Sequence, residues 1–233
     1  MLELAYRADS NSAAREGLWV RVPPAVPELT DPGIRCCAVP RDVAGCANER
    51  ELGAAYAYLL GLYLGDGMLS IGPRHVWRLR VSLDARYPQI IERGRRAIAD
   101  VCGRGPGATS RPGCVEIWSY WKHWVCLFPQ HGRGRKHERL IGLEAWQRNL
   151  VVAHPGEFLA GLIQSDGCRV LNRVKGHVYP RYFFSNLSGD IRELFAWACT
   201  LVGVESRNAG TRNVAVSRKA SVAILDRLVG PKA

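Results

Sequence analysis

The sequence predicts an α+β protein in which two copies of one unit pack against each other. Residues 59–67 read LLGLYLGDG and residues 159–167 read LAGLIQSDG, which places Asp66-Gly67 and Asp166-Gly167 100 residues apart. The elements predicted after each nonapeptide also match, in the order strand, strand, helix, strand, strand, helix. A repeat of this length favours two pseudo-symmetric αββαββα subdomains over a solenoid, whose units are shorter.

The first unit opens with an apolar run, Leu52–Gly65, of about 14 residues. It is apolar on nearly every side, which predicts a buried helix, and it is too short to span a bilayer. The patterns that follow predict strands at Met68–Ile71, Val76–Leu83 and Cys114–Ser119, and helices at Tyr87–Cys102 and Trp121–Phe128.

The same patterns recur in the second unit, with strands at Cys168–Val174, Tyr179–Asn186 and Asn213–Ser217, and helices at Asp190–Val202 and Lys219–Val229. A basic, glycine-rich stretch, Gly132–Arg139, and a helix-like segment, Leu143–Val152, join the two units. We therefore expect an extended or poorly ordered segment at 1–45, a first subdomain at 46–131, a linker and connecting helix at 132–154, and a second subdomain at 155–233.

Small residues mark one face of each nonapeptide helix. Gly61 and Gly65 are four residues apart, as are Gly161 and Ser165. Residues at this spacing lie on the same face of a helix, where small side chains let another backbone approach closely. Close packing would offset the cost of a helical glycine, about 1 kcal/mol relative to Ala. These four residues are the expected interface between the two helices.

The two aspartates stand at the predicted C-termini of these helices. A carboxylate there meets the negative end of the helix dipole, which is unfavourable by about 0.3–1 kcal/mol. If the helices pack side by side, Asp66 and Asp166 also repel each other. A divalent cation between them would remove both penalties, and hard oxygen ligands suit Mg²⁺. Such a metal can activate water and stabilise the leaving oxygen of a phosphodiester.

These motifs resemble those of the LAGLIDADG homing endonucleases, and the resemblance covers residues 50 to about 230. It implies a parallel pair of motif helices between antiparallel sheets that form a DNA-binding saddle. It also implies that Asp66 and Asp166 bind catalytic metal, with Gly65 and Ser165 in the same metal site. The first copy departs from the family pattern at Leu64 and Gly65, and the second at Gln164 and Ser165, none of which is the acidic position.

The resemblance implies an Mg²⁺-dependent enzyme that acts as a monomer and cuts both strands of a long, non-palindromic DNA site. It further places a basic residue near the scissile phosphates, after the closing helix of each unit. Lys136 fits this position in the first half, and Lys232 is the counterpart near the C-terminus. A solvated surface charge is the competing interpretation of both, and for Lys232 it is the favoured one. In the active role, each would neutralise phosphate charge and polarise the attacking water.

The strands carry the candidate DNA-contact residues. On one face of Val76–Leu83 lie Arg78, Arg80 and Ser82, opposite the apolar Trp77, Leu79, Val81 and Leu83. A β-ribbon fits the major groove, where Arg reads guanine bidentately. The full candidate set is Arg74, Arg78, Arg80, Ser82, Arg169, Arg173, Lys175, Arg181, Arg212 and Arg218. The competing interpretation is that these are ordinary solvated charges on amphipathic strands. For the aromatic run Trp118, Tyr120, Trp121 and Trp124, core packing is favoured over base stacking.

Composition agrees with a nucleic-acid partner. The formal net charge is +11 and spreads along the chain, which favours a broad polyanion-binding face. The eight cysteines show no metal-binding spacing, and residues 1–20 lack an apolar signal-peptide core. We therefore expect reduced thiols in a cytoplasmic or nucleoid-associated protein that is not secreted and has no membrane partner.

Two other functions fit the same fold. One is an RNA maturase that assists intron splicing, with intron RNA as a partner. The other is a non-catalytic DNA-binding regulator, which typically loses the acids and adds a helix-turn-helix domain. Both aspartates are kept here, and residues 1–45 lack helical patterning, which favours the endonuclease. Intein splicing blocks are missing.

Overall fold

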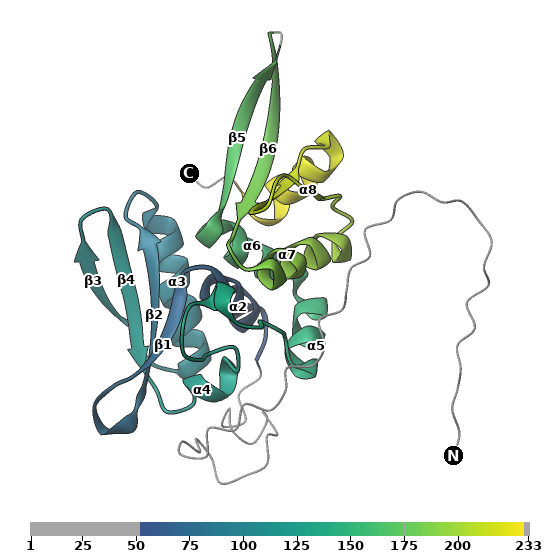
Figure 1. Cartoon of the computed structure of the whole chain (residues 1–233). Coiled ribbons are helices and arrows are strands. Elements are labelled where there is room, and N and C mark those ends of the chain that lie inside the picture. Colours follow the sequence, from purple (N-terminus) through teal and green to yellow (C-terminus); the bar gives the residue numbers. More distant parts are fainter. Residues whose placement is uncertain (1–51, 175, 231–233) are drawn as a thin grey trace, which may run out of the picture.

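The computed structural model describes residues 52–174 and 176–230 (Figure 1). The segment 1–45, Lys175 and Lys232 lie outside the described residues, so the predictions made for them are not addressed by the fold.

Two units of the same order make up the described chain. The first runs α2 (Ala54–Asp66), β1 (Gly67–Ile71), β2 (Trp77–Asp84), α3 (Pro88–Cys102), β3 (Gly107–Arg111), β4 (Cys114–Tyr120) and α4 (Trp124–Leu127). The second runs α6 (Pro155–Asp166), β5 (Gly167–Val174), β6 (His177–Ser185), α7 (Gly189–Leu201), β7 (Arg207–Asn208), β8 (Asn213–Val216) and α8 (Lys219–Leu228). Between them lie a short 3-10 turn, η2 (Lys136–Glu138), and α5 (Ala145–Ala153). This order confirms the predicted α+β fold, while the residue boundaries of the subdomains stay predictions.

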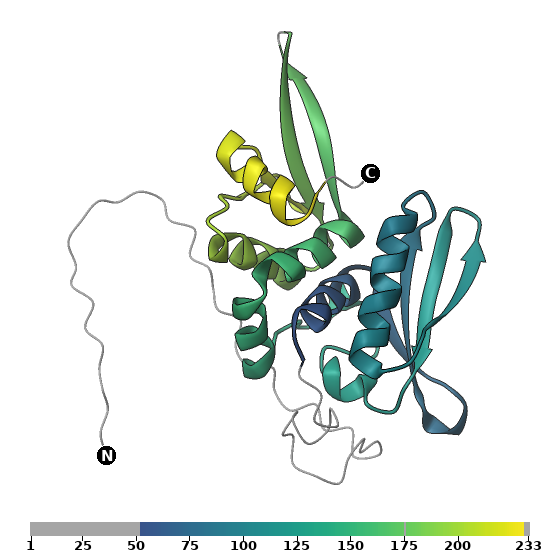
Figure 2. The same ribbon diagram turned by 180° about the vertical axis from the view of Figure 1, so that it is seen from behind.

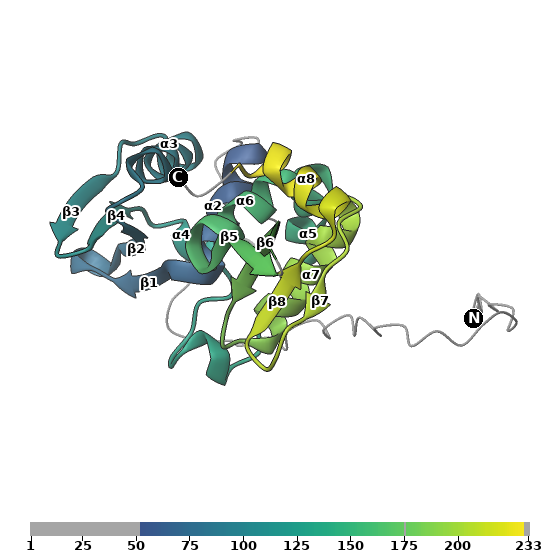
Figure 3. The same cartoon turned by 90° about the horizontal axis from the view of Figure 1, so that it is seen from above.

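Each unit contains one four-stranded antiparallel sheet. The strand orders are β1-β2-β4-β3 and β5-β6-β8-β7, so the two sheets have equivalent topologies. In Figure 3, α2 and α6 lie between the sheets. In Figure 2, α3 covers one face of the first sheet, and in Figure 1 the β5–β6 hairpin projects beyond the helices of its unit. We call the face turned away from the helices the outer face of each sheet.

The core face of β2 follows the predicted alternation. Trp77, Leu79, Val81 and Leu83 are all buried, because they point to the side covered by the helices. In the second sheet, Tyr182 and Phe184 of β6 occupy the equivalent core positions. The intervening side chains of both strands therefore belong to the outer faces.

The helices α2 and α6 form the seam between the units. A Cβ added at Gly61 would lie 2.5 Å from the Phe158 carbonyl oxygen and 2.9 Å from the Gly161 Cα, so no side chain fits there. Four residues later, a Cβ at Gly65 would lie 2.5 Å from the Ser165 Cβ. The contact thus moves four residues forward in α2 and four residues forward in α6, so the two helices are parallel.

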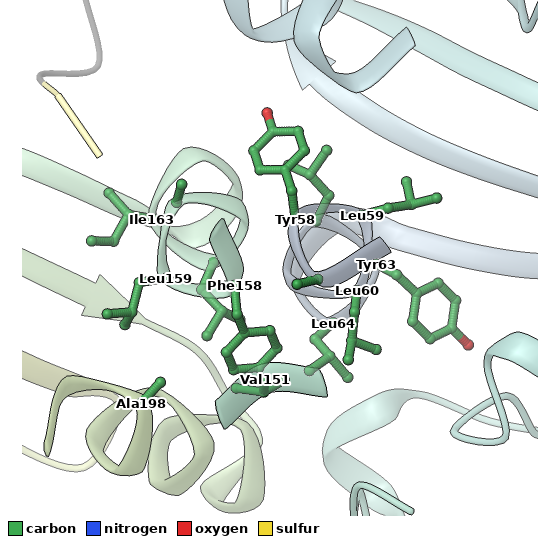
Figure 4. Packing of buried hydrophobic residues seen from close by; sticks show 14 of the residues in the cluster. Tyr58, Leu59, Leu60, Tyr63, Leu64, Val151, Phe158, Leu159, Ile163 and Ala198 are labelled. Atoms are coloured by element: carbon green, nitrogen blue, oxygen red, sulfur yellow. The ribbon is translucent and has the colours of Figure 1, made fainter. Parts of the chain in front are cut away.

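Apolar side chains close the rest of the seam. Figure 4 shows Leu60 and Leu64 of α2 and Phe158 of α6 packed together, with Val151 of α5 beside them. All four side chains are fully buried. Burial of large aliphatic and aromatic side chains contributes about 1.5–3 kcal/mol each, so this seam is a major part of the core.

The linker helix is joined to the first unit through a buried polar network. The Gln147 amide donates to the Tyr56 hydroxyl at 2.7 Å and to the Leu127 carbonyl at 3.2 Å, and it accepts from the Gln130 amide at 2.5 Å. Buried amides are tolerated when they are hydrogen-bonded in this way. The network therefore fixes α5 against α2.

Each motif helix turns directly into a strand at its Asp-Gly pair. Gly67 and Gly167 both have an extended backbone, with φ of −89° and −103°. A Cβ at Gly67 would lie 2.5 Å from the Tyr63 Cα, and one at Gly167 would lie 2.7 Å from the Ile163 Cα. Glycine is needed here because the strand passes close to the helix, which fixes each aspartate at the turn.

Within the described residues, every helix is too short or too polar to cross a membrane. No disulfide joins the cysteines in the same part of the chain.

Candidate active site

A cleft of about 430 Å³ opens at the C-terminal ends of the two motif helices. Both units contribute to its walls. The first unit supplies residues of α2 and of the outer faces of β2 and β4, the second supplies residues of α6 and β6, and η2 of the linker also contributes. The lining residues include Asp66, Asp166, Lys136, His137, Arg80, Ser82, Glu116, Ser185 and Asn186. Three of the residues expected to act in catalysis thus share one cavity, and Gly65 also lies in its wall.

The two aspartates stand side by side at the foot of the seam. Asp66 is exposed and Asp166 is partly buried. A Cβ at Gly65 would lie 3.1 Å from Asp166 Oδ2, which places the Asp166 carboxylate next to the residue that precedes Asp66. The parallel packing of α2 and α6 therefore brings together two carboxylates that are 100 residues apart in the sequence.

Asn186 holds the Asp166 carboxylate. Its Nδ2 donates to Asp166 Oδ2 at 2.6 Å, while its Oδ1 accepts from the Ser188 amide at 2.8 Å. The side chain is thereby fixed on both sides. The sequence pattern does not single out Asn186, because the equivalent residue of the first unit is the apolar Leu83. Only the fold shows that the end of β6 approaches α6.

Lys136 reaches into the cleft from η2 and contacts the C-terminus of α2. Its Nζ donates to the carbonyls of Tyr63, Leu64 and Gly65, the last two at 3.0 Å. An ammonium group at this end of a helix is favoured by the helix dipole. Burial lowers the pKa of Lys136 to about 8, and the charges of Asp166 and Asp66 act in the opposite direction. Its charge is thus placed beside both carboxylates.

The donors in the cleft suit a hard divalent cation. In the described part of the chain, no cluster of three or more His, Cys, Asp or Glu side chains forms a complete metal site. Mg²⁺ usually binds through one or two carboxylates and completes its shell with water and phosphate oxygens. Asp66 and Asp166 meet this requirement. The Ser165 hydroxyl instead donates to the Gly161 and Leu162 carbonyls at 2.9 Å, and the Gly65 carbonyl accepts from Lys136. The carboxylates are therefore the stronger candidate ligands.

Known structures match this architecture, although their sequences differ widely. The homing endonuclease I-WcaI bound to its DNA recognition sequence aligns with a TM-score of 0.54 and 13% identity, over 82% of this chain and 87% of that one. I-DmoI in complex with DNA and Mn gives 0.52 and 12%, over 76% and 96%. The N-terminal LAGLIDADG domain of DUF199/WhiA gives 0.50 and 13%, over 76% and 81%. The chain has the LAGLIDADG fold. No protein-family model and no curated protein matches the sequence.

On the first sheet of this LAGLIDADG fold, the predicted contact residues are joined by an acid that sequence analysis missed. Arg78 and Arg80 lie on the outer face, where Arg78 Nη2 is 3.1 Å from Glu116 Oε1 and Arg80 Nη1 is 3.5 Å from Glu116 Oε2. The Arg78 guanidinium also lies over the rings of Trp118 and Tyr120, at 5.1 and 5.6 Å from their centroids. Core packing was expected for these two aromatic residues and is wrong, because the register of β4 turns them outward.

Trp124 behaves as expected. It is fully buried, and its Nε1 donates to the Ser119 carbonyl at 3.2 Å. Trp121 is partly buried and packs against the same core.

On the second sheet, the predicted contact residues of β5 and β6 point in opposite directions. Arg169 pairs with Tyr182, whose side chain is buried, so Arg169 lies on the core side. Its guanidinium binds Asp226 of α8 at 2.8 and 3.0 Å. Arg173 is four pairs further along, an even number, and therefore shares that face. Arg169 and Arg173 therefore lie on the opposite face of the sheet from Arg181, and their role as DNA contacts stays a prediction. Arg181, which pairs with Val170, lies on the outer face as expected.

The remaining candidate arginines lie outside the strands of the LAGLIDADG sheets. Arg74 is in the turn between β1 and β2, with a left-handed φ of 58°, and is exposed. Arg212 is in the exposed turn before β8. Arg218 precedes α8 and forms an ion pair with Glu205. Arg74 and Arg212 stay candidates for phosphate contact, while Arg218 already has an acidic partner.

Proposed function

We propose that this protein is a metal-dependent endonuclease that cuts both strands of a long, non-palindromic double-stranded DNA site. The observation that carries the proposal is the cleft at the foot of the seam, which gathers Asp66, Asp166 and Lys136 from three distant parts of the chain. A purely structural pair of helix ends would have no reason to keep two carboxylates side by side, because they repel each other.

The surface beside the cleft supports DNA as the substrate. Arg80 and Ser82 of the first sheet and Ser185 of the second line the cleft, so both outer faces open onto it. The net charge of +11 favours a polyanion, and β-ribbons of this kind fit the major groove. The fold neighbour I-WcaI is bound to its DNA recognition sequence, which supports DNA as the class of partner.

Each cleft residue has a separate task in this proposal. Asp66 and Asp166 hold Mg²⁺, which supplies activation of water and charge stabilisation at the phosphate. Asn186 fixes the orientation of Asp166, since a hydrogen bond to a metal-binding carboxylate orients it. Lys136 stabilises negative charge that develops on the phosphate oxygens, as preorganised cations do in water-excluded sites. We further propose that the protein acts as a monomer, because one chain supplies both acids.

Cleavage of a selected DNA site tests the proposal. A site is selected by binding from a randomised duplex library in Ca²⁺, cloned into a plasmid, and incubated with the protein in Mg²⁺. We expect linear plasmid from the native protein. We expect no linear plasmid from Asp66→Asn or Asp166→Asn, with binding in Ca²⁺ retained. Asp100→Asn, which removes an exposed carboxylate from α3, serves as the control and should cut normally. Full cleavage by either active-site variant would refute the assignment.

A non-catalytic DNA-binding regulator is the second candidate, favoured by the match to the WhiA domain. It predicts binding to a defined site in either metal with no cleavage by the native protein. The RNA maturase alternative predicts that the native protein accelerates splicing of an intron RNA while the selected DNA site stays intact. The three functions therefore give different outcomes with the same preparation.

A further inference from the structure

The outer faces of the two sheets carry unlike side chains at equivalent positions. In the first sheet, Met68 follows the Asp-Gly pair and lies opposite Arg80. In the second sheet, Cys168 follows its Asp-Gly pair and lies opposite Phe183. Arg80 and Phe183 therefore occupy the same place in the two units. Arg80 lines the cleft, and Phe183 lies two residues before Ser185, which also lines it.

One step further from the cleft, the two units agree. Arg78 precedes Arg80 by two residues, and Arg181 precedes Phe183 by two residues, so both lie on the outer faces. Residues two apart on a strand are about 7 Å apart, which matches about two base-pair steps of 3.4 Å in B-DNA. We call the place of Arg80 and Phe183 the inner position, and that of Arg78 and Arg181 the outer position. Both units have arginine at the outer position, whereas the inner position holds arginine in the first unit and phenylalanine in the second.

The strands β4 and β8, which lie next to β2 and β6, also differ between the two units. Opposite Ser82 in β4 is Glu116, and opposite Ser185 in β8 is Asn213. Glu116 is 7% exposed and contacts both Arg78 and Arg80, so it holds two guanidinium groups in place. The second unit has an uncharged amide where the first has this acid.

These side chains favour different bases. Arg is the side chain that most often reads guanine, through two hydrogen bonds to its O6 and N7 atoms, whereas an apolar group such as Phe contacts the methyl group of thymine. Glu116 holds both guanidinium groups, and that of Arg78 also lies over aromatic rings, so both lose less rotamer freedom on binding. The inner position therefore favours a G·C pair in the first half-site and an A·T pair in the second.

We propose that Arg80 and Phe183 are a specificity-determining pair and that Glu116 is the positioning residue for the first half-site. Arg80 selects guanine next to the cleft, and Phe183 selects thymine at the equivalent place in the other half. Arg78 and Arg181 select guanine about two base pairs further out in both halves. The inference rests on the proposed function, since it names the base preferences of the DNA that the enzyme binds.

Selection from a randomised duplex library in Ca²⁺ tests this on the native protein. We expect a bound site in which the outer guanines occur in both halves and the inner base pair differs between them. The double variant Phe183→Arg with Asn213→Glu rebuilds the first-unit arrangement in the second unit. We expect it to change the inner preference of one half-site from thymine to guanine and to leave the other half unchanged. If the double variant still binds DNA and the base preference is unchanged in both halves, the proposed role of Arg80 and Phe183 is overturned.

Glu116→Gln tests the positioning role. It should weaken discrimination at both guanine positions of one half-site by roughly tenfold, and raise affinity for unrelated DNA because one negative charge is lost. Glu92→Gln removes the same charge from the exposed side of α3 and should raise that affinity without changing any base preference. Thermal melting of both variants reports folding. Should Glu116→Gln fail to fold, Arg80→Lys keeps the charge but loses the planar fork, and should lose the inner guanine preference alone.

The outcomes separate this inference from the proposed function. A defined site that is cut but has the same inner base pair in both halves refutes the inference and leaves the endonuclease intact. If no sequence is enriched from the library, both fail.

Discussion

Arg93 of α3 binds Glu157 of α6 at 2.7 Å, and its guanidinium lies 4.1 Å from the centre of the Tyr58 ring. Tyr58 in turn donates to Gln164 of α6 at 2.6 Å. These contacts join the first unit to the second across one side of the seam. Because the two aspartates stand at the end of the same pair of helices, contacts that fix the seam also fix the distance between them.

We expect Arg93→Ala to lower the free energy of unfolding by about 1 kcal/mol, since it removes a partly exposed ion pair and a cation–π contact. Arg96→Ala is the matched control on the same helix, because among the described residues Arg96 pairs with Glu92 of its own helix alone, and its side chain is 75% exposed. It should change stability by less than about 0.5 kcal/mol. Urea unfolding of both variants decides this, and equal losses would mean that the cross-seam contact contributes nothing of its own.

Close packing of the seam predicts a cost for even one methyl group. Gly61→Ala places a Cβ 2.5 Å from the Phe158 carbonyl oxygen, and neither helix backbone can move without opening the seam. Alanine would favour the helix by about 1 kcal/mol, but overpacking costs about 1–3 kcal/mol or more, so we expect a net loss of stability. Gly105→Ala, whose Cβ would meet nothing within 4 Å, should be neutral. Melting temperatures of the two variants give the comparison, and a stabilised Gly61→Ala would contradict the packing.

Much of the fold follows from local sequence pattern. The repeat of LLGLYLGDG and LAGLIQSDG, the small residues of the seam and the alternation in β2 are all short-range signals, and each predicts its element correctly. The two aspartates were also found this way, because a matched pair of acids at equivalent places in a repeat is visible without a structure.

The sequence is less informative where the position of a side chain depends on pairing between strands. A strand has two faces, and a shift of one residue in its register exchanges them. Arg169 and Arg173 show this, since their pattern in β5 is as regular as that of Arg78 and Arg80 but the core lies on the other side. Glu116 and Asn186 were missed because their partners are brought near only by tertiary packing.

Asn186 offers a test of the active site that leaves both acids in place. Asn186→Ala removes the hydrogen bond to Asp166 Oδ2, so the carboxylate is no longer held toward the cleft. Loss of such a contact typically costs 10- to 100-fold in metal affinity or activity, and we expect this range for the cleavage rate at limiting Mg²⁺. Excess Mg²⁺ should restore part of the rate, while DNA binding stays unchanged. Asn149→Ala, at an exposed position of α5, is the control. If the cleavage rate of Asn186→Ala depends on Mg²⁺ as that of the native protein does, Asn186 does not position Asp166.

The Asp226 carboxylate predicts how stability depends on pH. Hydrogen bonds from Arg169 hold the pKa of Asp226 below its ordinary value of 3.8, with a further contribution from Tyr182, while burial acts in the opposite direction. A carboxylate whose pKa is lower in the folded state stabilises the fold above its unfolded pKa, and this contribution is lost as pH falls through the folded value.

Asp226→Asn should therefore be less stable than the native protein at neutral pH, and the difference should shrink below about pH 4 as the native carboxylate becomes protonated. Melting curves from about pH 7 down to about pH 3 measure it, provided that both proteins refold. Asp100→Asn removes an exposed acid from α3 and should run parallel to the native curve. A gap between Asp226→Asn and the native protein that stays constant with pH would mean that the Arg169 contact stabilises the fold through packing alone. In that case the β5–β6 hairpin would be held to α8 without any contribution from charge.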